Sequence, residues 1–579
     1  MDDSIRTVLR EEFSRQELLN FVYSISRYNR IQGSQDLENA LKYVYNVLSE
    51  CKNLSVQIYS FDYAKSYGIH RPLIGWDVTY AEVRLVKPTS KLLHTIYDSK
   101  TVVVAHSPPG TVEAPIVYVG EGVRERDYKD KDVSGKIVLA YGNPYLVYMT
   151  GIEYGVKGFV FFRRRGPDDA VPYLGLFLEP REISKATAPA VSISRRNALD
   201  IINKLERGVE VVVRILVEAK YRNNAQIHVV EAKLGDSKRE VHICAHICHP
   251  GGTVNDNVSG SATLLELAHA FDRAISKGKL SPPRDSSIVF VWFPEYYGSL
   301  PYLMTKTKDS DIVFGINLDM IGERQEITGS TLNFIRSPST MRSPYEALVL
   351  YELFKELSHA TTISTMRKSL SYRLDVLPYE RGSDHDIYLQ LGIPSVMINQ
   401  WPDHYYHTDL DTVDKFDPEI AESIAIAVGT AAYMIASRSI DDRTLTMLNE
   451  YYDSYVRGLE ILRTPLNNLD KRYRTLAKTE QQKVRYRYIA EPGIPSLRIA
   501  FSKLPRRTFY EFLDLIEEEK YLWNLATGFI PIILRNKAMS VEEIAQQVLD
   551  EYGVEIKVDR LEKLLNYLVA MELVEQVRD

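Results

Sequence analysis

Four short segments with the residue pattern of buried β-strands each lead to a histidine or a carboxylate. Parallel strands of an open α/β sheet bring their carboxyl ends to one edge, where ligands bind. We therefore expect these side chains to meet in a single site. Histidine nitrogens with carboxylate oxygens are the ligand set of a catalytic zinc ion or a related divalent ion. The segments are Glu240–Ala245 before His246, Ser287–Phe293 before Glu295, Asp311–Leu318 before Asp319, and Pro394–Asn399 before the loop with His407.

The length and patterning of the chain indicate several structural units. A chain of 579 residues is too long for one hydrophobic core. Residues 1–60 and 222–440 alternate strand and helix patterns, which predicts an α/β fold with a mixed, mostly parallel sheet flanked by helices. Residues 61–221 contain short strand patterns punctuated by Gly and Pro, which predicts an inserted β-rich domain. We interpret residues 441–535 as a helical linker region and residues 536–579 as a compact helix-turn-helix unit.

Charge, cysteine content and apolar runs narrow the function classes. The formal net charge is −6, with 71 basic and 77 acidic residues, so no global excess favours nucleic acid or an anionic membrane. Apolar runs such as Ile288–Phe293 are far shorter than the ~20 residues that span a bilayer. The first residues are charged and contain no apolar signal segment. Three cysteines do not form a disulfide framework, so we expect a cytoplasmic protein without a membrane partner.

The segment after the first strand carries two histidines and an aspartate. His246 and His249 are candidate ligands because neutral imidazole is the commonest metal ligand. For His249, a hydrogen-bonded turn residue is the alternative. Asp256 precedes a helical pattern and is either a helix N-cap or a ligand that bridges two cations. Cys244 and Cys248 lack a second cysteine pair, which argues against a cysteine zinc site.

Two carboxylates follow the next strands. Glu295 is either a ligand or the general base for a metal-bound water, with an ion pair as the alternative. Asp319 ends another buried strand, where a carboxylate needs a cation or a salt-bridge partner. Residues 379–388 and 401–412 concentrate further ionisable groups, and we select His407 as the ligand among them.

These motifs, in this order, resemble the M28 family of zinc-dependent aminopeptidases. The resemblance covers residues 25–60 and 222–440. It implies one or two zinc ions, or another divalent metal, held by His246, Asp256, Asp319 and His407. The matching motifs are Arg30–Ser34, Asp256-Asn257 with Ser259-Gly260, Asn317–Gly322, Gly382–Asp386, Gly392–Pro394 and Tyr406–Thr408.

The resemblance also implies roles for the residues around the metal. The enzyme would remove N-terminal residues from peptides, with Glu295 taking a proton from the metal-bound water and delivering it to the leaving amine. An acidic group would bind the free α-amino group of the substrate, and a tyrosine hydroxyl would support the oxyanion. The substrate-binding candidates are Asp384 (or Asp386), His385, Tyr405 and Tyr406.

Two departures from the family pattern leave the number of metal ions open. The family has His-x-Asp where this chain has His246-Ile-Cys248, and it has two successive glutamates where this chain has Glu295-Tyr296. The protein then holds one tight ion, recruits His249 as a ligand, or is an inactive scaffold on the same fold.

The outer parts of the chain resemble two further modules. Asp132–Leu139 and Gly155–Gly158 resemble parts of a protease-associated domain, and the C-terminal unit resembles a winged helix found in a branch of aminopeptidase-like proteins. A winged helix would suit a nucleic-acid-linked regulator. Residues 535–579, however, carry ten acidic and six basic residues, which argues against DNA as a partner.

The C-terminal unit is expected to pack against the peptidase part or against a second subunit, which leaves a homo-oligomer open. Its predicted elements are a helix over Ser540–Asp550 with a serine cap, a helix over Arg560–Met571 capped by Asp559, and a strand over Leu573–Val577.

Overall fold

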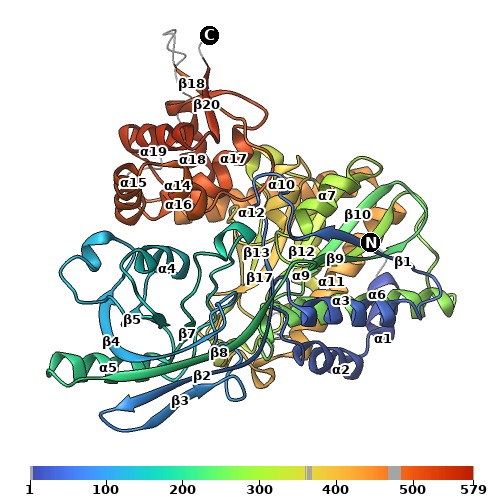
Figure 1. Ribbon diagram of the computed structural model, residues 1–579. Helices are drawn as coiled ribbons and strands as arrows, with labels where there is room; N and C mark the ends of the chain where they lie inside the picture. The colour runs from blue at the N-terminus through green and yellow to red at the C-terminus, as the bar shows by residue number, and fades with distance from the viewer. Residues whose placement is uncertain (1–3, 359, 362–367, 467–483, 578–579) are drawn as a thin grey trace.

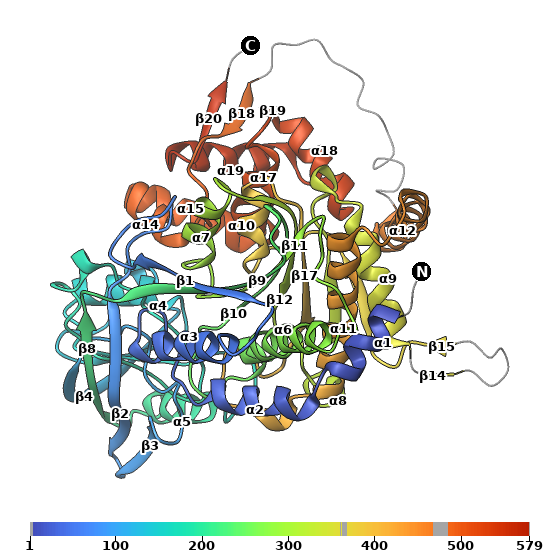
Figure 2. The same cartoon turned by 90° about the vertical axis from the view of Figure 1, so that its right-hand side faces the viewer.

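The computed structural model describes residues 4–358, 360–361, 368–466 and 484–577 (Figure 1). An α/β structure is built around one large sheet, and a second sheet lies beside it. A group of C-terminal helices contacts both parts (Figures 1 and 2).

The large sheet has eight strands, and most of its neighbours are parallel. β10 pairs in parallel with β11 and β12, β12 with β17, and β13 with β16, whereas the β1–β9, β9–β11 and β13–β17 pairs are antiparallel. This confirms the predicted α/β fold with a mixed, mostly parallel sheet. In sheet order the strands are β1 (Ser55–Asp62), β9 (Gln226–Leu234), β11 (Ser287–Phe293), β10 (Arg239–His246), β12 (Asp311–Leu318), β17 (Ser395–Trp401), β13 (Thr331–Ile335) and β16 (Leu374–Leu377).

Helices bury both faces of this sheet because its central strands are apolar on both sides. Val241 and Ile243 of β10 belong to the larger core, on one face of the sheet. The next residue, Cys244, belongs to the smaller core on the opposite face. The larger core is covered by α1 (Ser4–Glu12), α2 (Arg15–Ser26), α3 (Gln35–Leu48), α6 (Gly260–Ser276), α9 (Tyr345–Leu357) and α11 (Pro418–Ser437). The smaller core is covered by α7 (Ser299–Lys306) and α10 (His385–Gln390).

Among the described residues, α11 alone is long and apolar enough to cross a membrane, and 94% of its apolar window is buried inside the protein. Such burial is what the core helix of an α/β layer shows.

The second sheet is inserted between two neighbouring strands of the first. β1 and β9 are antiparallel neighbours, with Asp62 opposite Gln226, so the chain leaves the large sheet and returns to it at the same edge. The second sheet is mixed: β4 to β7 are parallel, and β2, β3 and β8 add antiparallel pairs. Its elements are β2 (Gly75–Lys87), β3 (Lys91–Thr95), β4 (Gly110–Gly120), β5 (Ile137–Ala140), α4 (Pro144–Glu153), β6 (Gly158–Phe161), β7 (Ala190–Ser192), α5 (Arg195–Glu206) and β8 (Val212–Arg222).

The C-terminal unit combines helices with a three-stranded sheet in the order β19-β18-β20. Its central strand, β18 (Arg485–Tyr488), comes from the region that we interpreted as a helical linker, so this sheet begins well before residue 536. The helix α12 (Asp442–Arg463) packs on α9 and belongs to the core of the large sheet. The other elements of the C-terminal unit are α14 (Leu497–Lys503), α15 (Arg506–Glu518), α16 (Tyr521–Asn524), α17 (Ile530–Ile533), β19 (Met539–Ser540), α18 (Val541–Tyr552), α19 (Val558–Ala570) and β20 (Val574–Val577).

The capping predictions for this unit have different outcomes. Ser540 accepts a hydrogen bond from the backbone N–H of Glu543 and forms a capping box with it, as expected for the start of α18. The predicted cap at Asp559 is wrong, because α19 begins at Val558 after Lys557 and Asp559 lies in its first turn. A carboxylate there still suits the positive end of the helix dipole.

Short elements complete the described chain. They are the antiparallel pair β14 (Ala360–Thr361) and β15 (Lys368–Ser369), the one-turn helix α8 (Gln325–Thr328), the 3₁₀ turns at Glu125–Asp127, Pro180–Glu182, Ser339–Met341 and Val413–Lys415, and the π-type turns at Asn255–Ser259 and Leu525–Phe529.

Candidate metal centre

The predicted ligands meet at the carboxyl-terminal edge of the large sheet. His246 is the last residue of β10, Asp319 directly follows β12, and His407 lies in the loop after β17. Asp256 enters from the turn that precedes α6. The potential ligand atoms form two clusters that share Asp256: His246, Asp256 and Asp319 in one, and His249, Asp256 and His407 in the other.

The first cluster joins one histidine to two carboxylates. His246 Nε2 lies 3.1 Å from Asp319 Oδ1 and 3.4 Å from Asp256 Oδ1. All three side chains are nearly inaccessible to solvent. Burial by itself would lower the pKa of His246, but Asp319 and Glu295 raise it well above its ordinary value. The cluster therefore concentrates negative charge in a buried place, which a cation would neutralise.

The second cluster is built from two histidines and the other oxygen of Asp256. His407 Nε2 lies 2.8 Å from Asp256 Oδ2, and His249 Nε2 lies 3.6 Å from the same oxygen. The two Nε2 atoms are 3.1 Å apart. Burial lowers the pKa of His249 to about 3, so its ring is neutral, as a metal ligand must be.

The spacing of these atoms fits a zinc ion in each cluster. Ligand atoms placed tetrahedrally at about 2.0–2.1 Å from zinc are roughly 3.3 Å from one another. The five separations given above, each of which involves a histidine nitrogen, run from 2.8 to 3.6 Å. Asp256 gives one oxygen to each cluster, which is the arrangement of a carboxylate that bridges two cations.

Arg30 fixes the loop that carries His246 and His249. The backbone of His249 has φ of +110°, a left-handed conformation that a side chain with a Cβ seldom adopts. The carbonyl oxygen of Arg30 accepts a hydrogen bond of 2.9 Å from His249 N–H, which holds this conformation. The guanidinium is fully buried and donates to the carbonyl oxygens of Ile247, Ile25, Tyr28 and Thr253.

Cys248 occupies the place of the aspartate that the family pattern has two residues after the candidate ligand histidine. Its Sγ lies 3.7 Å from Nδ1 of His246 and accepts a hydrogen bond from the backbone N–H of Glu295. Burial raises the pKa of this thiol, so it is neutral. Cys248 thus joins the two loops but adds no negative charge behind His246.

Glu295 lies beside the two clusters that share Asp256 but belongs to neither of them. It forms a third potential group with His246, Cys248 and His249. Burial raises the pKa of Glu295 well above its ordinary value, and the neighbouring carboxylates of Asp384 and Asp256 add to this. A carboxyl group with such a raised pKa suits proton transfer.

Tyr296 points away from the ligand clusters. Its hydroxyl donates a hydrogen bond of 2.9 Å to Asp386 Oδ2, and its backbone N–H donates to Asp384 Oδ1 at 2.8 Å. Asp384 also accepts a hydrogen bond from the hydroxyl of Ser299. Asp384 is fully buried, and its Oδ1 holds this loop. Its expected role as the binder of the substrate amine stays a prediction.

The other substrate-binding candidates lie in different places. His385 is fully buried, with Nε2 2.9 Å from the carbonyl oxygen of Glu380, and it therefore supports the loop. The ring of Tyr405 faces the amino group of Lys415. Tyr406 stacks on the ring of His407, with centroids 3.8 Å apart, and lines a cavity beside the metal centre. Tyr405 does not line that cavity.

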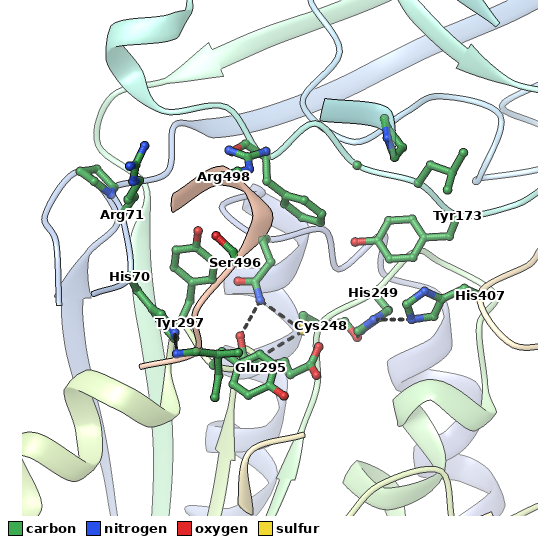
Figure 3. A pocket seen from close by; sticks show the side chains of 18 of the residues that line it. His70, Arg71, Tyr173, Cys248, His249, Glu295, Tyr297, His407, Ser496 and Arg498 are labelled. Atoms are coloured by element: carbon green, nitrogen blue, oxygen red, sulfur yellow. Dashed lines mark hydrogen bonds between the residues drawn. The ribbon is translucent and has the colours of Figure 1, made fainter. Parts of the chain in front are cut away.

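Two cavities meet at Glu295. The larger, of about 470 Å³, is lined by Cys248, His249, His407 and three arginines, and we call it the arginine cavity (Figure 3). The smaller, of about 300 Å³, is lined by His246, Asp256, Asp319 and Tyr406, and we call it the aspartate cavity. Each ligand cluster therefore faces its own cavity, and Glu295 is in the wall of both.

Comparison with known proteins agrees with this geometry. Residues 228–432 match Peptidase family M28. This M28 segment contains all the proposed ligands and Glu295, so the resemblance seen in the motifs is confirmed there. A sequence search of curated proteins finds no match.

Solved structures share the fold of the chain at low sequence identity. A zinc aminopeptidase from Bacillus subtilis, BSAP, has a TM-score of 0.52 at 17% identity, over 73% of this chain and 95% of that chain. The Peptidase M28 precursor from Shewanella amazonensis has 0.55 at 17%, over 76% and 98%. A putative peptidase from Clostridium acetobutylicum has 0.50 at 14%, over 99% and 98%. At these identities the likeness is one of fold.

Sequence reasoning missed three kinds of residue at this centre. Arg30 appears in a matching motif, but nothing in the sequence shows that its side chain supports the histidine loop. The hydrogen bonds of Tyr296 became visible only in the structure. The arginines of the larger cavity come from distant parts of the chain and carry no local pattern.

Proposed function

We propose that the protein is a two-zinc aminopeptidase that removes N-terminal residues from peptides. The observation that carries this proposal is the pair of ligand clusters that share Asp256. His249 supplies the third ligand of the second cluster, where Tyr296 replaces the glutamate of the family pattern. An inactive scaffold is the second candidate, because of that same replacement, but the position of His249 favours a complete centre.

The residues of the chain divide the chemistry between them. Bound zinc supplies Lewis acidity toward the scissile carbonyl and lowers the pKa of a bound water. Glu295 accepts the proton of that water and passes it to the leaving amine. Tyr406, whose ring stacks on that of His407, would support with its hydroxyl the carbonyl oxygen that gains charge.

Four further proposals concern the inserted sheet, the C-terminal unit, the location of the protein and the identity of the metal. We propose that the inserted sheet is a protease-associated domain and that the C-terminal unit is a winged helix used for packing within the protein. We also propose a cytoplasmic location, which fits the low cysteine content, and self-association through the C-terminal unit. Zinc is the proposed metal because histidine and carboxylate ligands suit it, although other divalent ions bind such sets.

The test is the metal content and turnover of two purified proteins. Wild type is expected to hold about two zinc equivalents and to hydrolyse aminoacyl anilides. Glu295→Gln is expected to keep the zinc and to lose roughly 10²–10⁴-fold in kcat, because a general base contributes about that factor. Glu326→Gln, at an exposed position, is the matched control. Wild type that takes up no metal when zinc is supplied would rule the proposal out.

A further inference from the structure

The arginine cavity is enclosed by parts of the chain that lie far apart in sequence. Tyr173 and Phe177 come from the insert, Glu295 and His407 from the large sheet, and Arg498 from the C-terminal unit (Figure 3). His249 and His407 lie toward the right of the view, and Arg71 and Arg498 lie toward its upper left (Figure 3). Between them the lining is mainly aromatic and aliphatic. A cavity of about 470 Å³ with apolar walls and a few polar groups suits a small ligand.

The far end of this cavity is positively charged. Arg71 and Arg498 line this end. The third arginine of the lining, Arg163, donates to the carbonyl oxygen of Tyr406 and therefore lies nearer His407. The one carboxylate in the lining is Glu295. His70 adds no charge, because burial lowers its pKa to about 4. An anionic group of the substrate would meet its partners there.

Nearby carboxylates offset only part of this charge. Arg71 pairs with Glu179 at 2.9 Å, but Arg181 pairs with the same carboxylate. Arg498 lies 3.9 Å from Glu182, donates to the carbonyl oxygen of Phe177, and stacks on the ring of Tyr145.

The pKa values of two of the arginines reflect this incomplete pairing. Burial lowers the pKa of Arg498, and burial also lowers the pKa of Arg163, whose guanidinium donates to the carbonyl oxygens of Tyr406 and Tyr173. Carbonyl oxygens do not neutralise a cation, so a carboxylate bound beside Arg498 would stabilise its guanidinium group.

The aspartate cavity has no such excess of cations. Its lining includes Arg381, but Glu380 is its direct neighbour and lines the same cavity. A peptide with free ends carries a positive charge at its amino end and a negative charge at its carboxyl end. The carboxyl end therefore fits the arginine cavity, and the first residue fits the aspartate cavity.

We propose that the arginine cavity binds the C-terminal carboxylate of a short peptide, so that the preferred substrates are oligopeptides with a free carboxyl end. This inference rests on the proposed aminopeptidase function, because it assigns the two ends of the same peptide substrate to the two cavities that meet at Glu295. Guanidinium groups bind carboxylates with charge-assisted, often bidentate hydrogen bonds.

The first experiment compares tripeptides that differ only at the carboxyl end. Wild type is expected to cleave the free acid with kcat/KM about tenfold or more above that of the amide, the factor that one charge-assisted hydrogen bond supplies. A third peptide, an amide with glutamate as its last residue, separates an acidic side chain from the terminal carboxylate. Equal rates for acid and amide would overturn the proposal, and so would an acid-like rate for the glutamate amide.

Substitution of the arginines tests the site itself. Arg498→Gln and Arg71→Gln are each expected to reduce the acid-to-amide ratio toward one, while hydrolysis of an aminoacyl anilide, which has no carboxylate, stays near the wild-type rate. Arg498→Lys keeps the charge and should keep part of the preference. Arg507→Gln, whose side chain is 92% exposed on α15, is the control and should change nothing.

The design separates the two proposals. If wild type loaded with zinc cleaves none of these peptides or anilides, the aminopeptidase function itself fails. If it cleaves them all without regard to the carboxyl end, or if Arg498→Gln and Arg71→Gln keep the full preference for the acid, the carboxylate site alone fails.

Discussion

His249 is the residue that decides whether the centre holds one ion or two. Its imidazole converges with that of His407 on one oxygen of Asp256, and its strained backbone is held by the buried Arg30. A left-handed conformation in a residue with a Cβ costs of order 1–3 kcal/mol and persists where the surroundings impose it. In this conformation the His249 ring lies beside Asp256 and His407, as a third ligand of the second cluster.

Replacing His249 is therefore expected to remove one ion and leave the other. His249→Ala should bind about one zinc equivalent instead of two, because His246, Asp256 and Asp319 remain. Elemental analysis after dialysis against a weak chelator measures this. His404→Ala, an exposed histidine on the neighbouring loop, should keep both equivalents. Two equivalents in His249→Ala would show that another group completes the second cluster.

The sequence pattern located most of the ligand atoms for a simple physical reason. Parallel strands end at one edge, so residues at their carboxyl ends meet whatever their separation in the chain. This argument did not predict the contacts of Asp384, His385 and Tyr405. They follow loop segments, and only the structure shows whether a loop side chain points to the cavity or to the loop itself.

At the scale of elements, the turn from Asn255 to Gly260 links the metal centre to the core. It places Asp256 at the sheet edge and starts α6, which packs on β10 and β12. Asn257 donates to the carbonyl oxygen of Leu318 at the end of β12, directly before Asp319. A Cβ at Gly260 would lie 2.4 Å from that same carbonyl oxygen, closer than atoms can approach.

Gly260→Ala is thus expected to push α6 away from β12 and to disturb both carboxylate ligands. We expect a loss of about 1–3 kcal/mol in the free energy of unfolding, as for other overpacked sites, together with weaker zinc binding. Urea unfolding and chelator competition measure the two effects. Gly458→Ala in α12 is the matched control, because a Cβ there meets nothing within 4 Å. It should leave zinc binding unchanged and stability equal or slightly higher. A Gly260→Ala protein as stable as this control would contradict the steric argument.

Elements with strong patterns were predictable, and weakly marked ones were not. β11 and β12 have the predicted bounds, because both are mostly apolar segments and each is followed by a turn that carries a carboxylate. β18 was not predicted. It is a four-residue Arg-Tyr alternation that becomes a strand by pairing with β19 and β20 from the end of the chain.

At the scale of the whole molecule, Glu551 joins the C-terminal unit to the α/β part. The side chain is buried and accepts hydrogen bonds from the backbone N–H groups of Ser339 and Tyr379. Arg336 NH2 lies 3.7 Å from it and also pairs with Glu460. Loss of this carboxylate would leave buried donors without an acceptor.

Glu551→Ala is expected to lower the free energy of unfolding by about 1–3 kcal/mol, the cost of buried polar groups left unpaired. The C-terminal unit should then separate before the α/β part unfolds, which scanning calorimetry would record as an earlier transition. Glu562→Ala, at an exposed position of α19, should unfold like wild type. An unchanged single transition in Glu551→Ala would show that other contacts hold the unit in place.

The metal ligands and one wall of the arginine cavity are synthesised at different times. Every proposed ligand precedes residue 408, whereas Ser496 and Arg498 leave the ribosome later. One wall of the arginine cavity is therefore made of residues that are synthesised after every proposed metal ligand. If the proposed carboxylate site is right, the preference for short peptides depends on residues that are synthesised later than those that would hold the metal.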